Sequence, residues 1–320
     1  MNSNTSYMTA PVHPSKTSLS YRPRNSGYIP RALTFVAVVI IVLMLAVIFG
    51  NVLLGGIGTI SWEFLTHPPE QGMEAGGIST AIFGTVALVI LMVIAVVPVG
   101  VLTAIYLHEY TSPTSLLTRL IRQAINNLAG VPSIVFGLFG LGFFIGFIGG
   151  GLDKMFYDST RPIWGQPAII WASLTLALLT MPVVIIATEE ALRNIPQDIK
   201  DASLALGASK LQTIVRVILP QAMPGILTGA ILAVSRGAGE VAPIMFTGAA
   251  YYLPYLPTKL NDQFMELGYH IYIMATQSPD VEQTKPILYG TVLVLLILTF
   301  LLNFTAIIIR SKIRRRRIYG

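Results

Sequence analysis

Long runs of apolar residues dominate this chain and alternate with short polar stretches. Six runs reach roughly 20 residues or more, the length a helix needs to cross a bilayer core about 30 Å thick. None alternates apolar and polar residues in the manner of a membrane strand. The pattern predicts an all-α integral membrane protein with six transmembrane helices, at about 33–54, 78–107, 125–150, 168–188, 223–250 and 286–309.

The composition disfavours the other classes of protein. Of the 320 residues, 53% are hydrophobic and 11% are charged, whereas a soluble domain carries roughly 25% charged residues. One water-soluble core of this size has no room for so much apolar side chain. A soluble enzyme, a disordered chain and a nucleic-acid-binding domain are therefore poor interpretations. Cysteine is absent and the four histidines are far apart in sequence, so we expect no disulfide and no metal site.

The basic residues predict the orientation. They concentrate in the N-terminal tail, in the loops after the second and fourth runs, and in the C-terminal tail. The loops on the other side contain few, and a surplus of Lys and Arg marks cytoplasmic loops. Both termini are therefore predicted to be cytoplasmic. The net charge of +6 is interpreted as an orientation signal with some attraction to anionic membrane lipid, and no nucleic-acid partner is expected.

Two charged residues, Arg236 and Glu240, lie inside the fifth apolar run. If that helix starts near Pro224, Arg236 lies about 18 Å deep, near the middle of the membrane. A spacing of four residues predicts that both side chains share one helix face. One interpretation is a structural pair of mutually neutralising charges. We favour a pair that faces a polar pathway, since charges at this depth usually mark substrate routes and an arginine suits an oxyanion.

The segment between the fourth and fifth runs, 189–221, predicts two short helices. Pro196 suits the start of the first and Gly207 the turn that ends it. The second runs to Leu219, and Pro220 is expected to break the helix before the next span. Such a hairpin is suited to a partner's groove, and equally to lying on the membrane surface.

Three motifs in the chain resemble motifs of known permeases. Asp201, Ala202 and Ser203, followed at fixed spacing by Gly207 and by Leu219-Pro220, resemble the EAA loop of ABC-importer permeases, with Asp in place of Glu and Ser in place of the second Ala. The stretch 130–140 resembles a segment of the phosphate-importer permeases of the PstA and PstC families, and the stretch 235–247 resembles the PstA form. The matching residues of the third-helix motif are Gly130, Pro132, Ser133 and Gly137.

This resemblance, which covers most of 78–309, implies a type I ABC importer permease architecture and a function. It implies a multi-pass subunit of an ATP-driven phosphate importer in the bacterial cytoplasmic (inner) membrane. The implied partners are a PstC-like permease subunit, a PstB-like ATPase dimer and a PstS-like phosphate-binding protein. ATP with Mg²⁺ would bind to the ATPase, and this chain would bind no cofactor and carry no catalytic residue. Arg236 and Glu240 would form the charged pair of the translocation pathway, and 201–220 would couple to the ATPase.

The domain boundaries follow from the same features. We expect a flexible cytoplasmic tail at 1–30, a first transmembrane helix with its outer loop at 31–77, a permease domain at 78–309 that includes the coupling loop 189–221, and a basic tail at 310–320. The alternatives that stay open are a PstC-type subunit, a permease for another oxyanion, and an ATP-independent secondary phosphate carrier.

Overall fold

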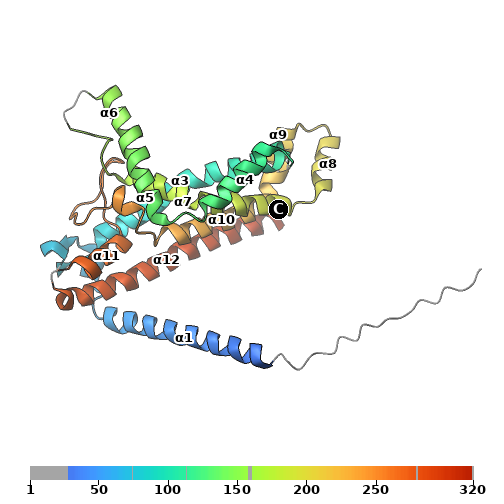
Figure 1. Cartoon of the computed structure of the whole chain (residues 1–320). Coiled ribbons are helices and arrows are strands. Elements are labelled where there is room, and N and C mark those ends of the chain that lie inside the picture. Colours follow the sequence, from blue (N-terminus) through green and yellow to red (C-terminus); the bar gives the residue numbers. More distant parts are fainter. Residues whose placement is uncertain (1–27, 74, 113, 158–160, 279, 319–320) are drawn as a thin grey trace, which may run out of the picture. The chain divides into compact units, whose positions relative to one another are not determined.

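The computed structural model describes residues 28–73, 75–112, 114–157, 161–278 and 280–318 (Figure 1). It divides into one unit up to Gly50 and a second from Asn51 onward, and each is described by itself. The described part of the first unit is the start of α1 (Tyr28–Gly56), a helix of almost entirely apolar residues. The predicted tail at 1–30 lies outside the described residues as far as position 27.

In its described residues the second unit consists of helices and a small β-hairpin. In this hairpin β1 (Pro69–Glu70) pairs with β2 (Ala75–Gly76) in antiparallel fashion, with Pro69 opposite Gly76. The π-helical turns η3, η4 and η5 continue neighbouring α-helices. The remaining elements are α2 (Trp62–Thr66), η2 (Gln71–Met73), α3 (Ser79–Ile105), η3 (Tyr106–Tyr110), α4 (Leu116–Leu128), α5 (Ser133–Phe139), η4 (Gly140–Gly149), α6 (Gly150–Phe156), α7 (Ile169–Arg193), α8 (Gln197–Ala205), α9 (Lys210–Thr213), η5 (Ile214–Ile218), α10 (Leu219–Gly237), η6 (Ile244–Phe246), α11 (Leu267–Gln277) and α12 (Val281–Ile318).

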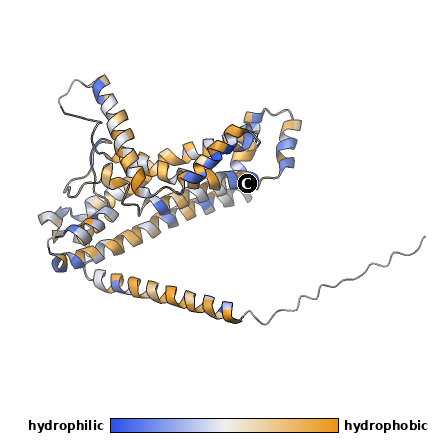
Figure 2. Ribbon diagram, viewed as in Figure 1, coloured by the Kyte–Doolittle hydropathy of each residue, from blue (hydrophilic) through white to orange (hydrophobic). Residues whose placement is uncertain are grey.

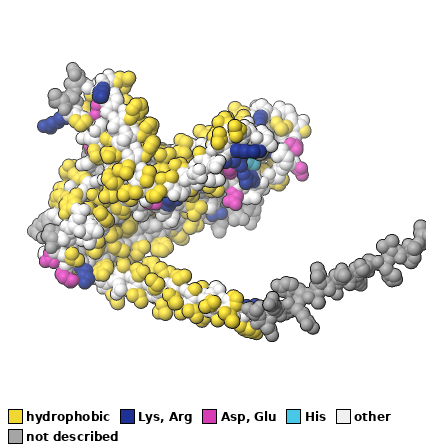
Figure 3. Space-filling model, in the orientation of Figure 1, with side chains coloured by type: hydrophobic (Ala, Val, Ile, Leu, Met, Phe, Trp, Pro, Cys, Tyr) yellow, Lys and Arg dark blue, Asp and Glu magenta, His cyan; other side chains and the backbone are white. Residues whose placement is uncertain are grey.

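Six helical segments among the described residues are long and apolar enough to cross a membrane, which confirms the predicted number. Figure 2 shows the apolar residues along these helices, and Figure 3 shows apolar side chains over much of the visible surface. The predicted first, second, fourth and sixth spans match to within about a turn and a half of helix at either end. The segments are Tyr28–Gly56, Ser79–Tyr110, Ser133–Phe156, Ile169–Arg193, Lys210–Gly237 and Val281–Ile313.

The predicted start of the third span was wrong. Residues 125–128 belong to α4, a separate helix, and the span begins at Ser133. Pro132 precedes it in an extended conformation that starts α5. A proline restricts the residue before it to extended backbone, which favours a break at this point. Gly130 and Pro132, predicted as part of the third helix, therefore lie just before it.

The predicted fifth span was wrong at both ends. The helix begins at Lys210 and passes through Pro220, because the wider π-helical turn η5 lies directly before α10. Pro220 stands at the junction where the π-helical turn η5 passes into α10, so the hydrogen-bond spacing changes at this point. The helix then stops at Gly237, and 238–250 continues as turns with the short helix η6. This stretch is apolar because protein covers it, and the apolar pattern alone does not separate such a stretch from a helix.

The core of the second unit is the contact of α3, α7 and α10. On α10, Gly225 and Gly229 lie against Ala191 and Ala187 of α7 so closely that a Cβ on either glycine would come within 3 Å of an alanine Cβ. Small residues four apart let two helix backbones approach in this way. These contacts place α10 antiparallel to α7. The contact of Gly100 with Val184 places α3 alongside α7.

Residues 262–270 pack against the end of this core at which α3 and α7 begin. We call this segment the brace. The backbone oxygen of Asp262 accepts a hydrogen bond of 2.9 Å from Ile169 N of α7. Thr85 Oγ1 of α3 accepts one of 3.0 Å from Leu267 N. The oxygen of Phe264 accepts one of 2.8 Å from Ala250 N. The brace therefore joins α3 and α7 to the irregular stretch 238–250.

Two buried titratable side chains lie in this brace. The Glu266 carboxylate caps α11 by accepting hydrogen bonds of 2.8 Å from Gly268 N and 2.7 Å from Tyr269 N. Burial raises the pKa of Glu266 from 4.5 to about 7, although those hydrogen bonds oppose the shift. One turn later, His270 is buried with no hydrogen-bond partner on either ring nitrogen among the described residues. Burial lowers the pKa of His270 from 6.5 to about 4.

These shifts predict opposite pH dependences of the free energy of unfolding. Folded Glu266 retains its proton between pH 4.5 and about 7 while the unfolded chain loses it, so its contribution to stability falls as the pH rises through that range. Between pH about 4 and 6.5, His270 is protonated in the unfolded chain but neutral in the folded protein. Its contribution to the free energy of unfolding therefore rises as the pH rises through that range.

Glu266→Gln should therefore gain stability relative to the wild type as the pH rises from 4.5 to 7, and His270→Asn should lose it from 4 to 6.5. Thermal midpoints of both variants in nanodiscs, measured at several pH values against wild type, check this. Variants whose midpoints run parallel to the wild type across the whole range would contradict the assignment.

Candidate functional site

The predicted charged pair forms at the end of α10. Arg236 Nε lies 3.4 Å from Glu240 Oε1, and the side chains are 36% and 20% exposed. Arg236 occupies the last turn of the helix, whereas Glu240 lies beyond it. The predicted shared helix face was therefore wrong, although the two side chains do meet. The chain turns at Ala238 and Gly239, and this turn returns the carboxylate to the guanidinium.

The pair lies near the middle of the span formed by α3 and η3. A Cβ on Gly237 would lie 2.5 Å from Met92 Sδ of α3. Met92 is about 20 Å from the Ser79 end of that span and about 27 Å from Tyr110, at 1.5 Å per residue. Arg236 thus lies beside the middle of the α3 span, although its own helix starts and ends elsewhere than predicted. Its depth in the membrane stays a prediction. Broken helices with charges at this depth are typical of substrate sites in transporters.

The two motifs of 130–140 and 235–247 lie against each other. A Cβ on Gly137 would be about 3 Å from the oxygen of Ala242, the Cα of Pro243 and the ring of Phe246. At Gly140, Thr175 of α7 and Thr247 approach equally closely. Glycine is needed because a larger residue would push α5 away from the stretch after the charged pair. Gly137 therefore lies against the segment that follows the charged pair. Ser133 begins α5, and Gly130 and Pro132 lie just before it.

The predicted coupling loop 189–221 contains a tight hairpin. Gly207 has a φ of +85°, and the N–H groups of Gly207 and Ala208 donate to the oxygens of Leu204 and Ser203. This is a glycine helix cap that satisfies the last carbonyls of α8. Ser209 then begins α9 with a capping box to Gln212. The four residues 206–209 therefore form the turn between α8 and α9.

The other predicted residues of this loop occupy both faces of the hairpin. Asp201 and Ala202 are exposed on α8, and Asp201 Oδ1 accepts a hydrogen bond of 3.2 Å from Gln197 Nε2. Ser203 is half-buried, and its hydroxyl lies 2.9 Å from that of Thr213, which joins α8 to α9. Leu219 and Pro220 open α10. They lie apart from the charged pair, at the other end of the same helix.

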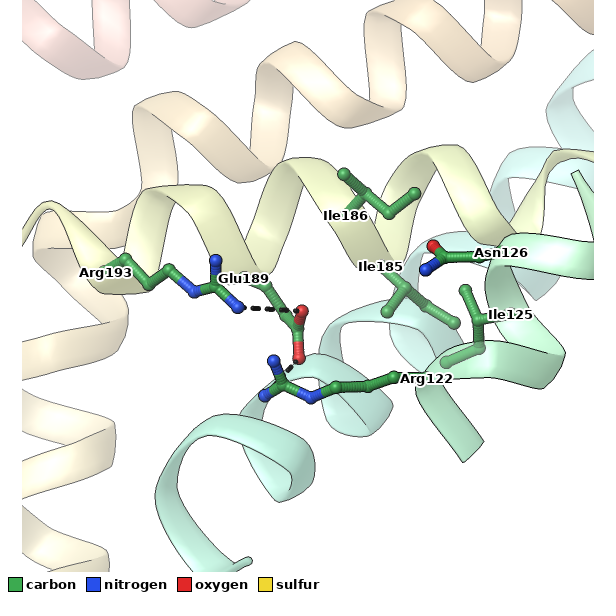
Figure 4. Close-up of a pocket in the computed structure, with 7 residues that line it drawn as sticks. All are labelled: Arg122, Ile125, Asn126, Ile185, Ile186, Glu189 and Arg193. Atoms are coloured by element: carbon green, nitrogen blue, oxygen red, sulfur yellow. Dashed lines mark ion pairs between the residues drawn. The ribbon is translucent and has the colours of Figure 1, made fainter. Parts of the chain in front are cut away.

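Sequence reasoning missed two acidic residues at this basic end. Glu189 of α7 pairs with Arg122 of α4 at 3.1 Å and with Arg193 at 3.9 Å. Figure 4 shows its carboxylate between the two guanidinium groups, beside a cavity of about 240 Å³. Glu109 of η3 pairs with Lys200 of α8. Each acid closely follows a long apolar run, and this position is the signal in the sequence that marks them.

Comparison with known proteins identifies the family. Residues 96–319 match the family model described as "Binding-protein-dependent transport system inner membrane component". The "Probable ABC transporter permease protein YqgI" of Bacillus subtilis (strain 168) is 35% identical over 208 residues, which are 65% of this chain and 65% of that protein. The "Phosphate transport system permease protein PstA 1" of Mycobacterium tuberculosis (strain CDC 1551 / Oshkosh) is 34% identical over 249 residues, 78% of this chain and 75% of that protein.

A solved structure supports the fold. A bacterial alginate ABC transporter, in complex with its alginate pentasaccharide-bound periplasmic protein, contains a chain that aligns with a TM-score of 0.60. The alignment covers 87% of this chain and 94% of that chain at 16% identity. It confirms the predicted fold of a type I ABC importer permease. The family model and the six apolar helices confirm a multi-pass inner-membrane protein. The chain belongs to the binding-protein-dependent transport system inner membrane components, and within them to the PstA family of phosphate transport permeases.

Proposed function

We propose that this chain is a membrane-spanning permease subunit of an ATP-driven phosphate importer. The observation that carries this proposal is the Arg236–Glu240 pair at mid-span, on a helix that ends there. A guanidinium is suited to the oxygens of an oxyanion. We assign phosphate as the substrate because the similar PstA proteins are named as phosphate transport permeases.

Glu240 would hold the guanidinium when no substrate is present. Arg236 donates to the carboxylate from Nε, and its side chain is 36% exposed. The terminal nitrogens would then donate to a phosphate ion in transit, while Glu240 prevents binding tight enough to trap it. An ion that is passing through must leave again, so a weak and temporary site serves transport better than a tight one.

The hairpin of α8 and α9 would face the cytoplasm and receive a partner ATPase. Its exposed apolar side chains support docking into a groove, since Leu206 is 90% exposed and Leu204 and Leu211 are also exposed. The basic residues at this end support the cytoplasmic placement of both termini. The further partners would be a second permease subunit similar to PstC, a PstB-like ATPase dimer, which would bind ATP and Mg²⁺, and a PstS-like phosphate-binding protein outside.

The charged pair is tested by removing each charge in turn. In vesicles that contain the assembled complex, Glu240→Gln and Arg236→Ala should each lower ATP-dependent uptake of radiolabelled phosphate by about tenfold or more. Arg236→Ala removes the donors to the passing ion, and Glu240→Gln removes the carboxylate that keeps the ion from being held too tightly. Copurification of the partner subunits should stay normal. Glu282→Gln, an acid of α12 whose side chain is 84% exposed, is the control and should transport as wild type does.

The outcomes separate the alternatives. Normal uptake by both variants would make the pair structural. Uptake by the wild type without ATP would identify a secondary carrier. ATP-driven uptake that excess sulfate abolishes would assign the complex to another oxyanion.

A second prediction concerns the hairpin turn. Gly207→Pro replaces a residue at φ +85° with one fixed near −65°, so the glycine cap of α8 is lost. The variant should reach the membrane yet retain much less ATPase subunit when the complex is purified. Gly207→Asn is the control, because asparagine tolerates positive φ. A Gly207→Pro complex with full ATPase content and full uptake would contradict the coupling role.

A further inference from the structure

Glu109 occupies a buried position where the α3 span ends. It lies in η3, the π-helical turn that extends α3 at the basic end, and its side chain is 7% exposed. Desolvating a carboxylate at such a place is costly unless cations compensate it. Cationic groups are therefore expected around Glu109.

The coupling hairpin consists of α8 and α9, and a lysine from each of these helices contacts Glu109. Lys200 of α8 forms an ion pair with Glu109 Oε1, and its side chain is 12% exposed. Lys210 of α9 donates from Nζ to the backbone oxygen of Glu109 at 2.5 Å. The same ammonium lies 4.6 Å from the ring centre of Tyr110. His108 Nε2 is 3.6 Å from Glu109 Oε1.

The hairpin holds the two lysines in a fixed relation. The hydroxyls of Ser203 and Thr213 meet at 2.9 Å across the hairpin, and the glycine cap at Gly207 closes its end. The chain joins the hairpin covalently to α7 and to α10. The hairpin is not adjacent to α3 in the sequence, so only noncovalent contacts can join the two. Glu109 supplies the polar part, and Ile105 packs with Ile214 and Ile218.

The α3 helix leads from this contact to the charged pair. Met92 of α3 lies against Gly237, next to Arg236, and is about 25 Å along the helix from Glu109 at 1.5 Å per residue. The helix is continuous through Pro98 and into η3 and is packed against α7 through Gly100, and such a packed element can carry a displacement over that distance. With the covalent links to α7 and α10, the hairpin then reaches all three helices of the core.

We propose that Glu109 is a positioning residue that ties the coupling hairpin to α3 through Lys200 and Lys210, so that movement of the hairpin reaches the mid-span charged pair. This inference rests on the proposed function. It assigns Glu109 to coupling, whereas an ion pair that only stabilises the fold would contribute equally in every state of the complex.

The test measures phosphate uptake and ATP hydrolysis in the same vesicles, using the full complex. Glu109→Gln should lower the number of phosphate ions imported per ATP hydrolysed by about fivefold or more, while the complex assembles and hydrolyses ATP. The charge exchange Glu109→Lys with Lys200→Glu should restore most of that ratio, and each single exchange should lose it. Glu282→Gln, an acid of α12 whose side chain is 84% exposed and which lies outside the coupling segment, should leave the ratio unchanged.

Three results would overturn the inference. One is a Glu109→Gln complex with the wild-type number of phosphate ions per ATP. Another is a double exchange that couples no better than the single ones. The third is a Glu109→Gln complex that falls apart and that the exchange restores only in assembly, which would make the pair structural. A wild-type complex without ATP-driven phosphate uptake would overturn the proposed function as well.

Discussion

A membrane-spanning chain must satisfy its backbone hydrogen bonds without help from lipid, and in this protein the demand falls on the residues after α10. That helix ends at mid-span, and 238–250 continues without regular helix. Ala238 N and Glu240 N donate back to the end of α10, Gly248 N and Ala249 N donate to Ile244 O, and Ala250 N donates to Phe264 O. No residue from 241 to 250 is exposed. Irregular backbone at this depth is possible because protein covers it.

The rest of the site follows from that covering. Gly137 and Gly140 lie against 242–247 because any larger residue would hold α5 away from it. The brace at 262–270 closes the other side through Thr85 and Phe264. Arg236 lies in the last turn of the helix that stops within this core, and its side chain is 36% exposed. This exposure is what the proposed role toward a passing phosphate ion requires. At the opposite end of α10, its N-terminal extension forms half of the coupling hairpin, so a single element joins the charged pair to the ATPase-facing surface we propose.

The sequence predicted the features that depend on local chemistry. Length and hydropathy gave six helical spans, and the hairpin at Gly207 followed from the need for positive φ. What failed depended on tertiary contacts. Residues 238–250 are as apolar as a span because they are buried in protein, and hydropathy does not register what buries them. Pro220 did not break its helix because a π-helical turn precedes it. The contacts of Glu109 and Glu189 join helices far apart in the chain, and nothing in one stretch of sequence pairs them.

The central claim is that Arg236 and Glu240 face a water-lined route near the middle of the membrane. The chain contains no cysteine, so one introduced thiol reports on its own position. Gly239 lies between the two residues, and a Cβ there meets no other atom within 4 Å. In the assembled complex, Gly239→Cys should react with a charged, membrane-impermeant thiol reagent, and ATP should change the side from which it reacts. Phe147→Cys, on the apolar surface of η4, should not react. A cysteine at 239 that stays unreactive from both sides, with and without ATP, would contradict the account.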